Sequence, residues 1–167
     1  IIYMKAKQEL EQLILNAIEN GSFPGANYAV VTKDKVWMGS LGNKEVYPNV
    51  VENNIDTIYD MASCSKVVST TTCIMLLLQR GQIRLYDYIK KYLPDYKYDD
   101  VTIWDLLTHT AGLPEGLIGC HHMNKEEIIN GVLNLEKKFE KNTKIAYSDC
   151  GFVLLGMIVE SVSGKTL

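Results

Sequence analysis

Hydrophobic and polar residues alternate with two different periods in the first part of the chain. Between residues 5 and 19 apolar side chains recur at helical spacing, and Asn20-Gly21 closes the pattern, which predicts an amphipathic helix. Residues 26–32 and 35–41 are rich in β-forming side chains, and Lys33-Asp34 between them predicts a tight connection. We therefore expect a β-hairpin packed on a helix.

From residue 67 onward the pattern is helical. Apolar residues cover almost the whole circumference of a helix predicted over 67–79, so we expect it to be buried on most sides, and Gly81 stands where a left-handed cap would end it. No convincing strand follows. Further helices are predicted over 85–92, 102–108, from 124 onward and, as a central helix, over 151–163; residues 42–54 are predicted to form a loop and 57–61 an extended segment.

This order of elements predicts two lobes. Residues 1–61 form the helix and hairpin of an α/β lobe, and residues 62–167 form an all-helical lobe, with Ser63 at the junction. The composition, 47% hydrophobic and 22% charged, is ordinary for a soluble globular protein. A net charge of −3 without a basic cluster argues against nucleic acid as a partner, and no apolar run approaches the length of a membrane span.

The cysteines and the first residues bear on the compartment. Cys64, Cys73, Cys120 and Cys150 show no paired spacing, so we interpret them as free thiols in a reducing compartment, although spacing alone leaves a disulfide open. No signal-peptide pattern opens the chain, which favours a cytoplasmic location. Because the first residue is Ile1 rather than Met, an exported protein whose leader was removed stays an alternative.

Two residues that could carry catalytic chemistry lie at the first turn of the helix predicted over 67–79. Ser63 and Lys66 are three residues apart and so share one helix face. A backbone N–H at a helix start favours a developing oxyanion, and a lysine in partly apolar surroundings can lose its charge and accept the proton of a serine. This S-x-x-K pair is weak by itself, because an N-cap serine followed by a solvated lysine has the same spacing.

A second candidate group precedes the last helix. Tyr147 and Asp149 are two residues apart in a predicted turn, so both side chains can point into one cavity. A tyrosine beside a lysine ammonium ionises more readily and can relay a proton to or from a serine. The alternative is a plain helix start, with Ser148 or Asp149 as the N-cap and Tyr147 packed against the first turns.

Together and in this order, these segments resemble the serine β-lactamase and penicillin-binding protein superfamily, and most of all its class C-like branch, which includes D-alanyl-D-alanine peptidases and esterases. The similarity runs through nearly the whole chain. Besides the S-x-x-K pair it rests on Phe23-Pro24-Gly25-Ala26, on Leu85-Tyr86-Asp87 with Tyr92-Leu93-Pro94, on the run from Leu106 to Pro114, and on Tyr147-Ser148-Asp149 with Leu154-Leu155-Gly156. The resemblance implies a two-lobe α/β β-lactamase/transpeptidase-like fold, here incomplete.

The resemblance also implies roles for the candidate residues. Ser63 would be the acylated nucleophile, Lys66 its general base, and Tyr147 the acid and base that serves the leaving group and the deacylating water. Asp149 departs from the family's usual asparagine at this position. A carboxylate there can keep Lys66 protonated and shift base duty towards Tyr147, and it lacks the amide that holds a substrate carbonyl, so both effects count against a strong β-lactam hydrolase.

Other candidate residues are interpreted as structural. His109 follows a short helix and is expected to bond backbone carbonyls. His121-His122 lacks a further ligand at suitable spacing, so we expect no metal site, and no cofactor motif is present. Gly164-Lys165-Thr166 is neither a phosphate loop nor the family's K-T-G motif, because Leu167 follows Thr166 and no glycine precedes at the required spacing; Gly164 is predicted to cap the last helix.

The family's third motif lies on a strand expected after this stretch, and that strand also supplies an oxyanion N–H. The chain thus looks like the N-terminal part of a longer protein, whose hairpin keeps an unpaired edge and can self-associate. The resemblance implies a serine hydrolase acting through an acyl-enzyme on a small-molecule or peptide substrate: a β-lactam, a D-Ala-D-Ala-like amide or an ester. The alternative is a truncated, non-catalytic remnant that serves as a binding or assembly module. The sequence does not decide the acyl substrate.

Overall fold

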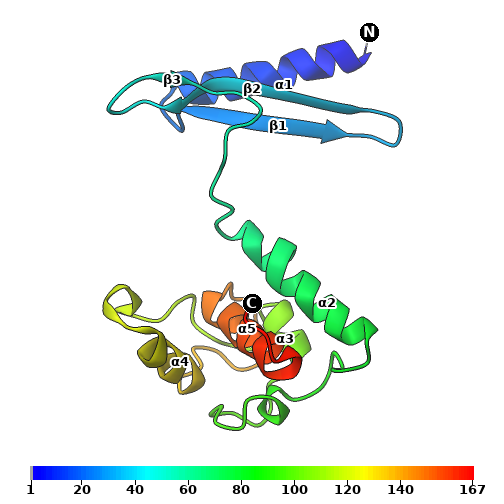
Figure 1. Cartoon of the computed structure of the whole chain (residues 1–167), viewed down its shortest axis with the longest axis vertical. Coiled ribbons are helices and arrows are strands. Elements are labelled where there is room, and N and C mark those ends of the chain that lie inside the picture. Colours follow the sequence, from blue (N-terminus) through cyan, green and yellow to red (C-terminus); the bar gives the residue numbers. More distant parts are fainter. Residues whose placement is uncertain (1) are drawn as a thin grey trace. The chain divides into compact units, whose positions relative to one another are not determined.

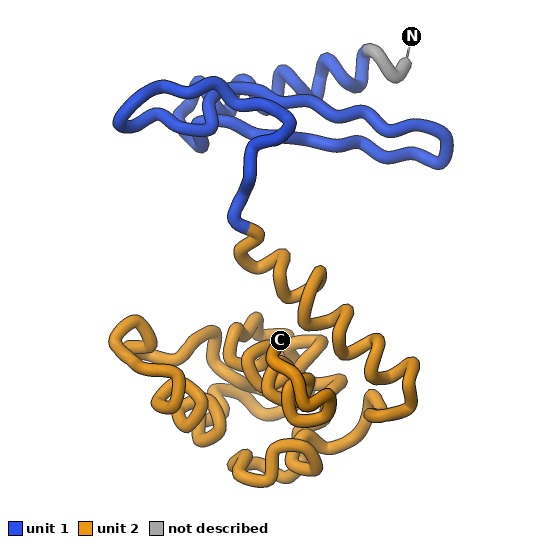
Figure 2. The backbone as a smooth tube through the Cα atoms, in the orientation of Figure 1, with its two compact units in different colours: residues 1–60 blue, residues 61–167 orange. Residues whose placement is uncertain are grey.

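The computed structural model describes the backbone of residues 2–167 and the side chains from residue 5 onward. Within it the chain divides into two units, Ile1–Asp60 and Met61–Leu167 (Figure 2). The first unit holds the strands and the N-terminal helix, and the second holds the remaining helices (Figure 1). The candidate residues Ser63, Lys66, Tyr147 and Asp149 therefore all belong to the second unit.

The first unit is a helix packed on an antiparallel sheet, as the sequence predicted. Helix α1 (Ile2–Glu19) lies along β1 (Gly25–Val31) and β2 (Val36–Glu45), and the short β3 (Val51–Glu52) completes the order β1-β2-β3 (Figure 1). The Tyr28 ring lies over Gly39, where an added Cβ would come within 2.6 Å of it. Its hydroxyl donates to Glu11 Oε1 at 2.5 Å, which fastens the sheet to the helix.

The loop predicted over residues 42–54 is wrong in part. Strand β2 continues to Glu45, and the chain returns to pair with it as β3. The buried side chain of Asn53 explains the return, because its amide donates to Asn27 Oδ1 at 2.8 Å and to the Leu41 carbonyl at 3.3 Å. A polar residue that suggested a solvated loop is instead satisfied inside the unit.

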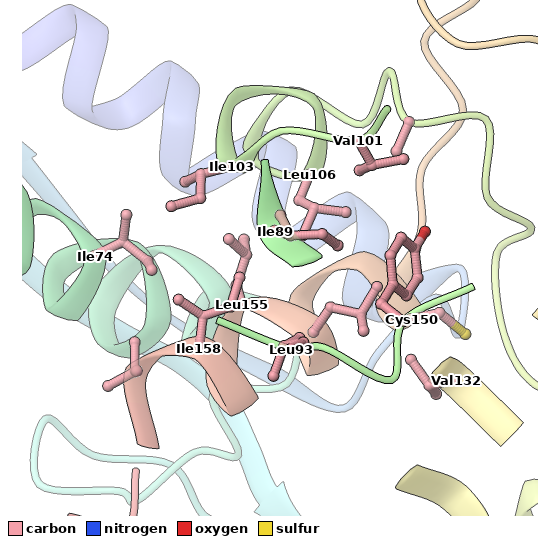
Figure 3. Close-up of a cluster of buried hydrophobic side chains, with 14 of the residues drawn as sticks. Ile74, Ile89, Leu93, Val101, Ile103, Leu106, Val132, Cys150, Leu155 and Ile158 are labelled. Atoms are coloured by element: carbon pink, nitrogen blue, oxygen red, sulfur yellow. The ribbon is translucent and has the colours of Figure 1, made fainter. Parts of the chain in front are cut away.

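The second unit is built around α5 (Asp149–Ser163), which confirms the prediction of a central last helix. α2 (Thr72–Gln79), α3 (Ile103–Leu107) and α4 (Lys125–Leu133) each contact it. Between them lies one cluster of buried apolar side chains, several of which Figure 3 draws. α5 begins at the N-cap Ser148, whose Oγ accepts the Gly151 N–H at 3.2 Å, and ends at Gly164 in the left-handed conformation, as predicted.

The starts of α3 and α4 follow from their capping boxes, since Thr102 pairs with Asp105 and Asn124 with Glu127. The helix predicted over residues 85–92 is wrong. Only a short 3₁₀ turn, η2 (Ile89–Lys91), forms there.

The reason lies in the contacts just before η2. Tyr88 is drawn into an antiparallel bridge with Thr102, and the Ile89 N–H donates to the Val101 carbonyl at 2.9 Å. The carboxylate of Asp87 accepts the Arg84 N–H at 3.0 Å and so closes a turn. These pairings hold the backbone away from helical geometry. A second 3₁₀ turn, η3 (Cys120–His122), precedes α4.

The helix predicted over residues 67–79 begins as η1 (Lys66–Thr71), a stretch of π-helix, and continues as α2. Its predicted end is confirmed, because Gly81 has φ +67 and the Gln82 N–H donates to the Leu77 carbonyl. The prediction that it is buried on most sides is wrong for this unit. One face, with Thr70, Ile74 and Leu77, is buried, whereas Val67, Val68, Met75 and Leu76 are exposed. Within the unit the helix packs on α5 along that single face.

No helix in the described part of the chain has both the length and the apolar character needed to cross a bilayer.

Candidate active site

Ser63 lies where an irregular connection leads into η1, the first part of the helix that continues as α2. The residue before it, Ala62, has φ 42, a left-handed conformation that is strained for alanine. The chain then tightens into a helical turn, in which the Lys66 N–H donates to the Ser63 carbonyl at 3.1 Å. This turn places the side chains of Ser63 and Lys66 on the same side of the helix start.

Two groups that can carry a proton converge on the Ser63 hydroxyl. Lys66 Nζ donates to Ser63 Oγ at 3.1 Å. The Tyr147 hydroxyl, which arrives from the segment before α5, donates to the same oxygen at 2.7 Å. Both distances lie within the hydrogen-bond reach that proton transfer requires.

Asp149 is the third contact of Lys66. Its Oδ1 lies 2.6 Å from Lys66 Nζ, and the Lys66 side chain is only 14% exposed whereas that of Asp149 is 58% exposed. Burial lowers the pKa of Lys66, but the hydrogen bonds and charges of Asp149 and Tyr147 outweigh it, so the pKa of this amine lies above its ordinary value. Lys66 is therefore a cation at neutral pH, stabilised further by the Tyr147 ring 4.9 Å away.

His109 packs against the catalytic tyrosine candidate. Its ring lies 4.7 Å from the Tyr147 ring and 5.2 Å from the Phe152 ring, centroid to centroid. Nδ1 accepts the Ser148 N–H at 3.1 Å, and the His109 carbonyl accepts the Ala146 N–H at 2.8 Å. Burial, with a smaller effect of the Lys66 charge, lowers the pKa of His109. A neutral imidazole with a free lone pair on Nδ1 is what this contact needs.

Further contacts fix the segment that carries Tyr147 and Asp149. The Ser148 hydroxyl donates to the Pro114 carbonyl at 2.6 Å, and the Asp149 N–H donates to the Glu115 carbonyl at 2.7 Å. The loop 109–115 thus holds three successive residues, 147–149, through their backbone or side chains. Asp149 is the first residue of α5 rather than part of a turn, which corrects the prediction for its backbone.

A groove of about 590 Å³ opens beside the ion pair, lined by Lys66, Asp149, Phe152, Ile128 and Ile129 among others. It lies between η1, α4 and α5, on one side of Lys66. In residues 2–167 no set of three or more His, Cys, Asp or Glu side chains is placed to hold a metal ion. The four cysteines are free thiols.

The structure brings together all four residues singled out from the sequence: Ser63, Lys66, Tyr147 and Asp149. His109 is structural, as expected, but it accepts a backbone N–H through its ring instead of bonding carbonyls. Its contact with Tyr147 was missed, because 38 residues separate them and only the fold places one ring on the other.

Ser63 thus lies at a helix start within hydrogen-bond reach of a lysine and a tyrosine, and comparison with known proteins identifies the family of the chain. Residues 10–167 match the family model described as Beta-lactamase, so the chain belongs to the β-lactamase family. It is 26% identical to the N-acetylmuramyl-L-alanine amidase of Bacillus subtilis (strain 168), over 98% of this chain and 42% of the amidase. The chain thus spans less than half the length of this relative.

Solved structures agree on the fold. A class C beta-lactamase superposes with a TM-score of 0.84 at 22% identity, covering 99% of this chain and 46% of the other. The octameric penicillin-binding protein homologue from Pyrococcus abyssi gives a TM-score of 0.78 at 26% identity, covering 95% of this chain and 40% of that one. The chain therefore has a partial β-lactamase/transpeptidase-like fold, as the sequence predicted.

Proposed function

We propose that this chain carries the nucleophilic part of a serine hydrolase that acts on amide or ester bonds through an acyl-enzyme. The observation that carries the proposal is that Ser63 Oγ accepts hydrogen bonds from both Lys66 Nζ, at 3.1 Å, and the Tyr147 hydroxyl, at 2.7 Å. A nucleophile within reach of two proton carriers is the minimal arrangement for covalent catalysis.

The proposed reaction has two stages. Ser63 Oγ bonds to the substrate carbonyl carbon while its proton passes to whichever neighbour is deprotonated, the Lys66 amine or the Tyr147 phenolate. The bond to the leaving nitrogen or oxygen then breaks as that atom takes a proton from Tyr147. In the second stage water attacks the ester carbonyl carbon and gives its proton to Tyr147. The bond between that carbon and Ser63 Oγ then breaks, Ser63 Oγ takes a proton back from Tyr147 or Lys66, and the acid is released.

The charge of Asp149 determines how the role of general base is shared between Lys66 and Tyr147. Because its carboxylate keeps Lys66 charged, the amine is seldom free to accept a proton near neutral pH. We assign the larger share of general-base work to Tyr147, whose hydroxyl lies 2.7 Å from Ser63 Oγ. The Ser63 N–H at the helix start supplies one donor to the oxyanion.

The substrate class follows from the relatives only in outline. One relative is named as an amidase of N-acetylmuramyl-L-alanine, and the structural neighbours are described as a beta-lactamase and a penicillin-binding protein homologue. An amide or ester such as a D-Ala-D-Ala-like peptide, a simple ester or, weakly, a β-lactam fits this proposal.

A second candidate is a non-catalytic binding or assembly module. The observation in its favour is the same Lys66–Asp149 ion pair at 2.6 Å, which withholds the usual base. The two candidates differ in one property, because only the hydrolase forms a covalent bond through Ser63.

Intact mass spectrometry after incubation with a fluorescent penicillin or a fluorophosphonate distinguishes them. We expect a single adduct on the wild type and none on Ser63→Ala, and Lys66→Ala should slow adduct formation by roughly 10²–10⁴-fold. Ser65→Ala is the matched control, because the Ser65 hydroxyl donates to the Ala62 carbonyl and does not contact Ser63 Oγ. An adduct that persists in Ser63→Ala would remove the nucleophile assignment.

A further inference from the structure

A second pocket, of about 280 Å³, lies next to Tyr147 and is distinct from the groove beside Lys66. Its walls come from the loop 113–115 on one side and the segment 138–146 on the other. The lining residues that matter for its chemistry are Pro114, Glu115, Lys138, Phe139, Lys144 and Tyr147. It is thus a small site with two cations, one carboxylate and an aromatic ring, beside the proposed acid–base group.

The two lysines of this pocket differ from their neighbours in having no acidic partner. Lys137 pairs with Asp100 at 2.7 Å and Lys141 lies 3.5 Å from Asp105. Among the described residues Lys138 and Lys144 form no ion pair. Their ammonium groups lie over one ring, that of Phe139, at 5.7 and 4.5 Å from its centroid. The ring holds two positive charges together without neutralising them.

The segment that carries these lysines is fixed by backbone hydrogen bonds. The Lys138 and Phe139 N–H groups both donate to the Gly112 carbonyl, at 2.8 and 3.1 Å, and the Ala146 N–H donates to the His109 carbonyl at 2.8 Å. Gly112 has φ +81, and a Cβ there would lie 2.1 Å from the Phe139 carbonyl oxygen, so only glycine permits this approach. The same loop anchors Tyr147, so the lysines are held in register with it.

We propose that this pocket is a subsite for a carboxylate carried by the substrate. The inference rests on the proposed function in one respect, namely that Tyr147 belongs to the reacting centre. Lys138 and Lys144 outnumber the single acidic group, Glu115, so the pocket attracts an anion, and the Phe139 ring and Pro114 accept the apolar stem of the same substituent. The preferred substrates are therefore amides or esters that bear a carboxylate on a short chain.

Equilibrium binding tests this subsite without relying on catalysis. The probes are glutaranilic acid, an amide that carries a carboxylate, and pentananilide, its uncharged counterpart, each titrated into the ¹⁵N-labelled chain and followed by NMR. We expect glutaranilic acid to bind more tightly and to shift the amide signals of residues 138–146. Lys138→Ala and Lys144→Ala should each weaken this preference about five-fold, and 1 M salt should reduce it, because exposed charges are screened.

Two further variants make the result decisive. Glu115→Gln removes the opposing charge and should strengthen binding of glutaranilic acid a few-fold, a gain that misfolding does not produce. Lys33→Ala is the control, because Lys33 is an exposed lysine of the hairpin turn and lines neither this pocket nor the groove beside Lys66. Equal binding of both probes, or an equal loss in Lys33→Ala, would overturn the subsite. Binding that persists in Ser63→Ala while no acyl adduct forms on the wild type would instead refute the proposed function and leave the subsite standing.

Discussion

Replacing Asp149 by asparagine should change the pH at which Ser63 is acylated. In the wild type the carboxylate of Asp149 lies 2.6 Å from Lys66 Nζ and contributes to raising the pKa of that amine, against the opposing effect of burial. Asparagine keeps the shape of the side chain but removes the charge. The Lys66 ammonium then loses its counter-ion in a site where the Lys66 side chain is only 14% exposed. The pKa of Lys66 should therefore fall, and a larger fraction of the amine should be neutral at a given pH.

The size of the effect follows from the geometry. Asp149 is more than half exposed, so water screens the pair, and we assign it about 1 kcal/mol, the upper end for a surface ion pair. At a pH below the amine's pKa, losing this energy raises the neutral fraction of Lys66 about five-fold. The part of acylation in which Lys66 is the base then accelerates by the same factor, and the rising limb of that part of the pH profile moves to lower pH.

The assay is single-turnover acylation, followed by intact mass with an activated ester in excess between pH 6 and pH 10. Asp149→Ala separates the charge effect from the new amide, because alanine removes the carboxylate without adding an N–H₂ that can hold a substrate carbonyl. Both variants should share the shift along the pH axis, and only the asparagine should add tighter substrate binding. Profiles that coincide with that of the wild type would show that Lys66 does not exchange its proton in this step.

Three other predictions concern the surroundings of the site. Gly112→Ala should cost at least about 2 kcal/mol and lower the melting temperature, because φ is +81 and the new Cβ meets the Phe139 carbonyl, whereas Gly116→Ala, with nothing within 4 Å, should not. The pKa of His109 is lowered in the folded protein, where Lys66 and Asp149 also face the ring, so its contribution to stability should be complete above its ordinary pKa of about 6.5 and be lost as the pH falls through the folded value. Asparagine tolerates the left-handed φ of 58 at this position, so in denaturant titrations His109→Asn should lose less stability over that pH range than the wild type. The free edge of β1 should drive self-association of this chain, measured by light scattering after size exclusion; Val31→Lys should reduce it, and Val46→Lys, outside the strands, should have no effect.

Local signals in the sequence predicted those elements that are stabilised locally. The capping boxes at Thr102 and Asn124 and the left-handed Gly81 and Gly164 each satisfy backbone groups within a few residues, so they can be read from spacing alone. The false helix over residues 85–92 has the opposite cause. The apolar pattern of residues 85–92 is typical of a helix, but the β-bridge between Tyr88 and Thr102 joins positions 14 residues apart. No local sequence pattern predicts that bridge.

The candidate site shows the same division. The order of motifs singled out Ser63, Lys66, Tyr147 and Asp149, and the structure brings these four side chains into contact. The packing of His109 on Tyr147 joins residues 38 positions apart, and η1 packs on α5 near the end of the chain, so both contacts are tertiary. The helix formed by η1 and α2 was predicted to be buried on most sides, but one face of it is exposed. An apolar circumference alone does not indicate which other elements cover each face of a helix.

The two proton carriers at Ser63 are anchored by different parts of the fold. Lys66 belongs to the helix start and is placed by η1, whereas Tyr147 is placed by the loop 109–115 through the contacts of Ser148, Asp149 and the His109 ring. Both donate to Ser63 Oγ, and Lys66 is also joined to the Tyr147 segment by its ion pair with Asp149, so a change in one anchor can reach the other. Perturbing the loop should therefore impair the proposed steps that use the Tyr147 proton, and through Asp149 it should also disturb the position of Lys66. The proposed carboxylate subsite shares the loop 109–115 with Tyr147, so we expect one structural element to govern both substrate positioning and leaving-group chemistry.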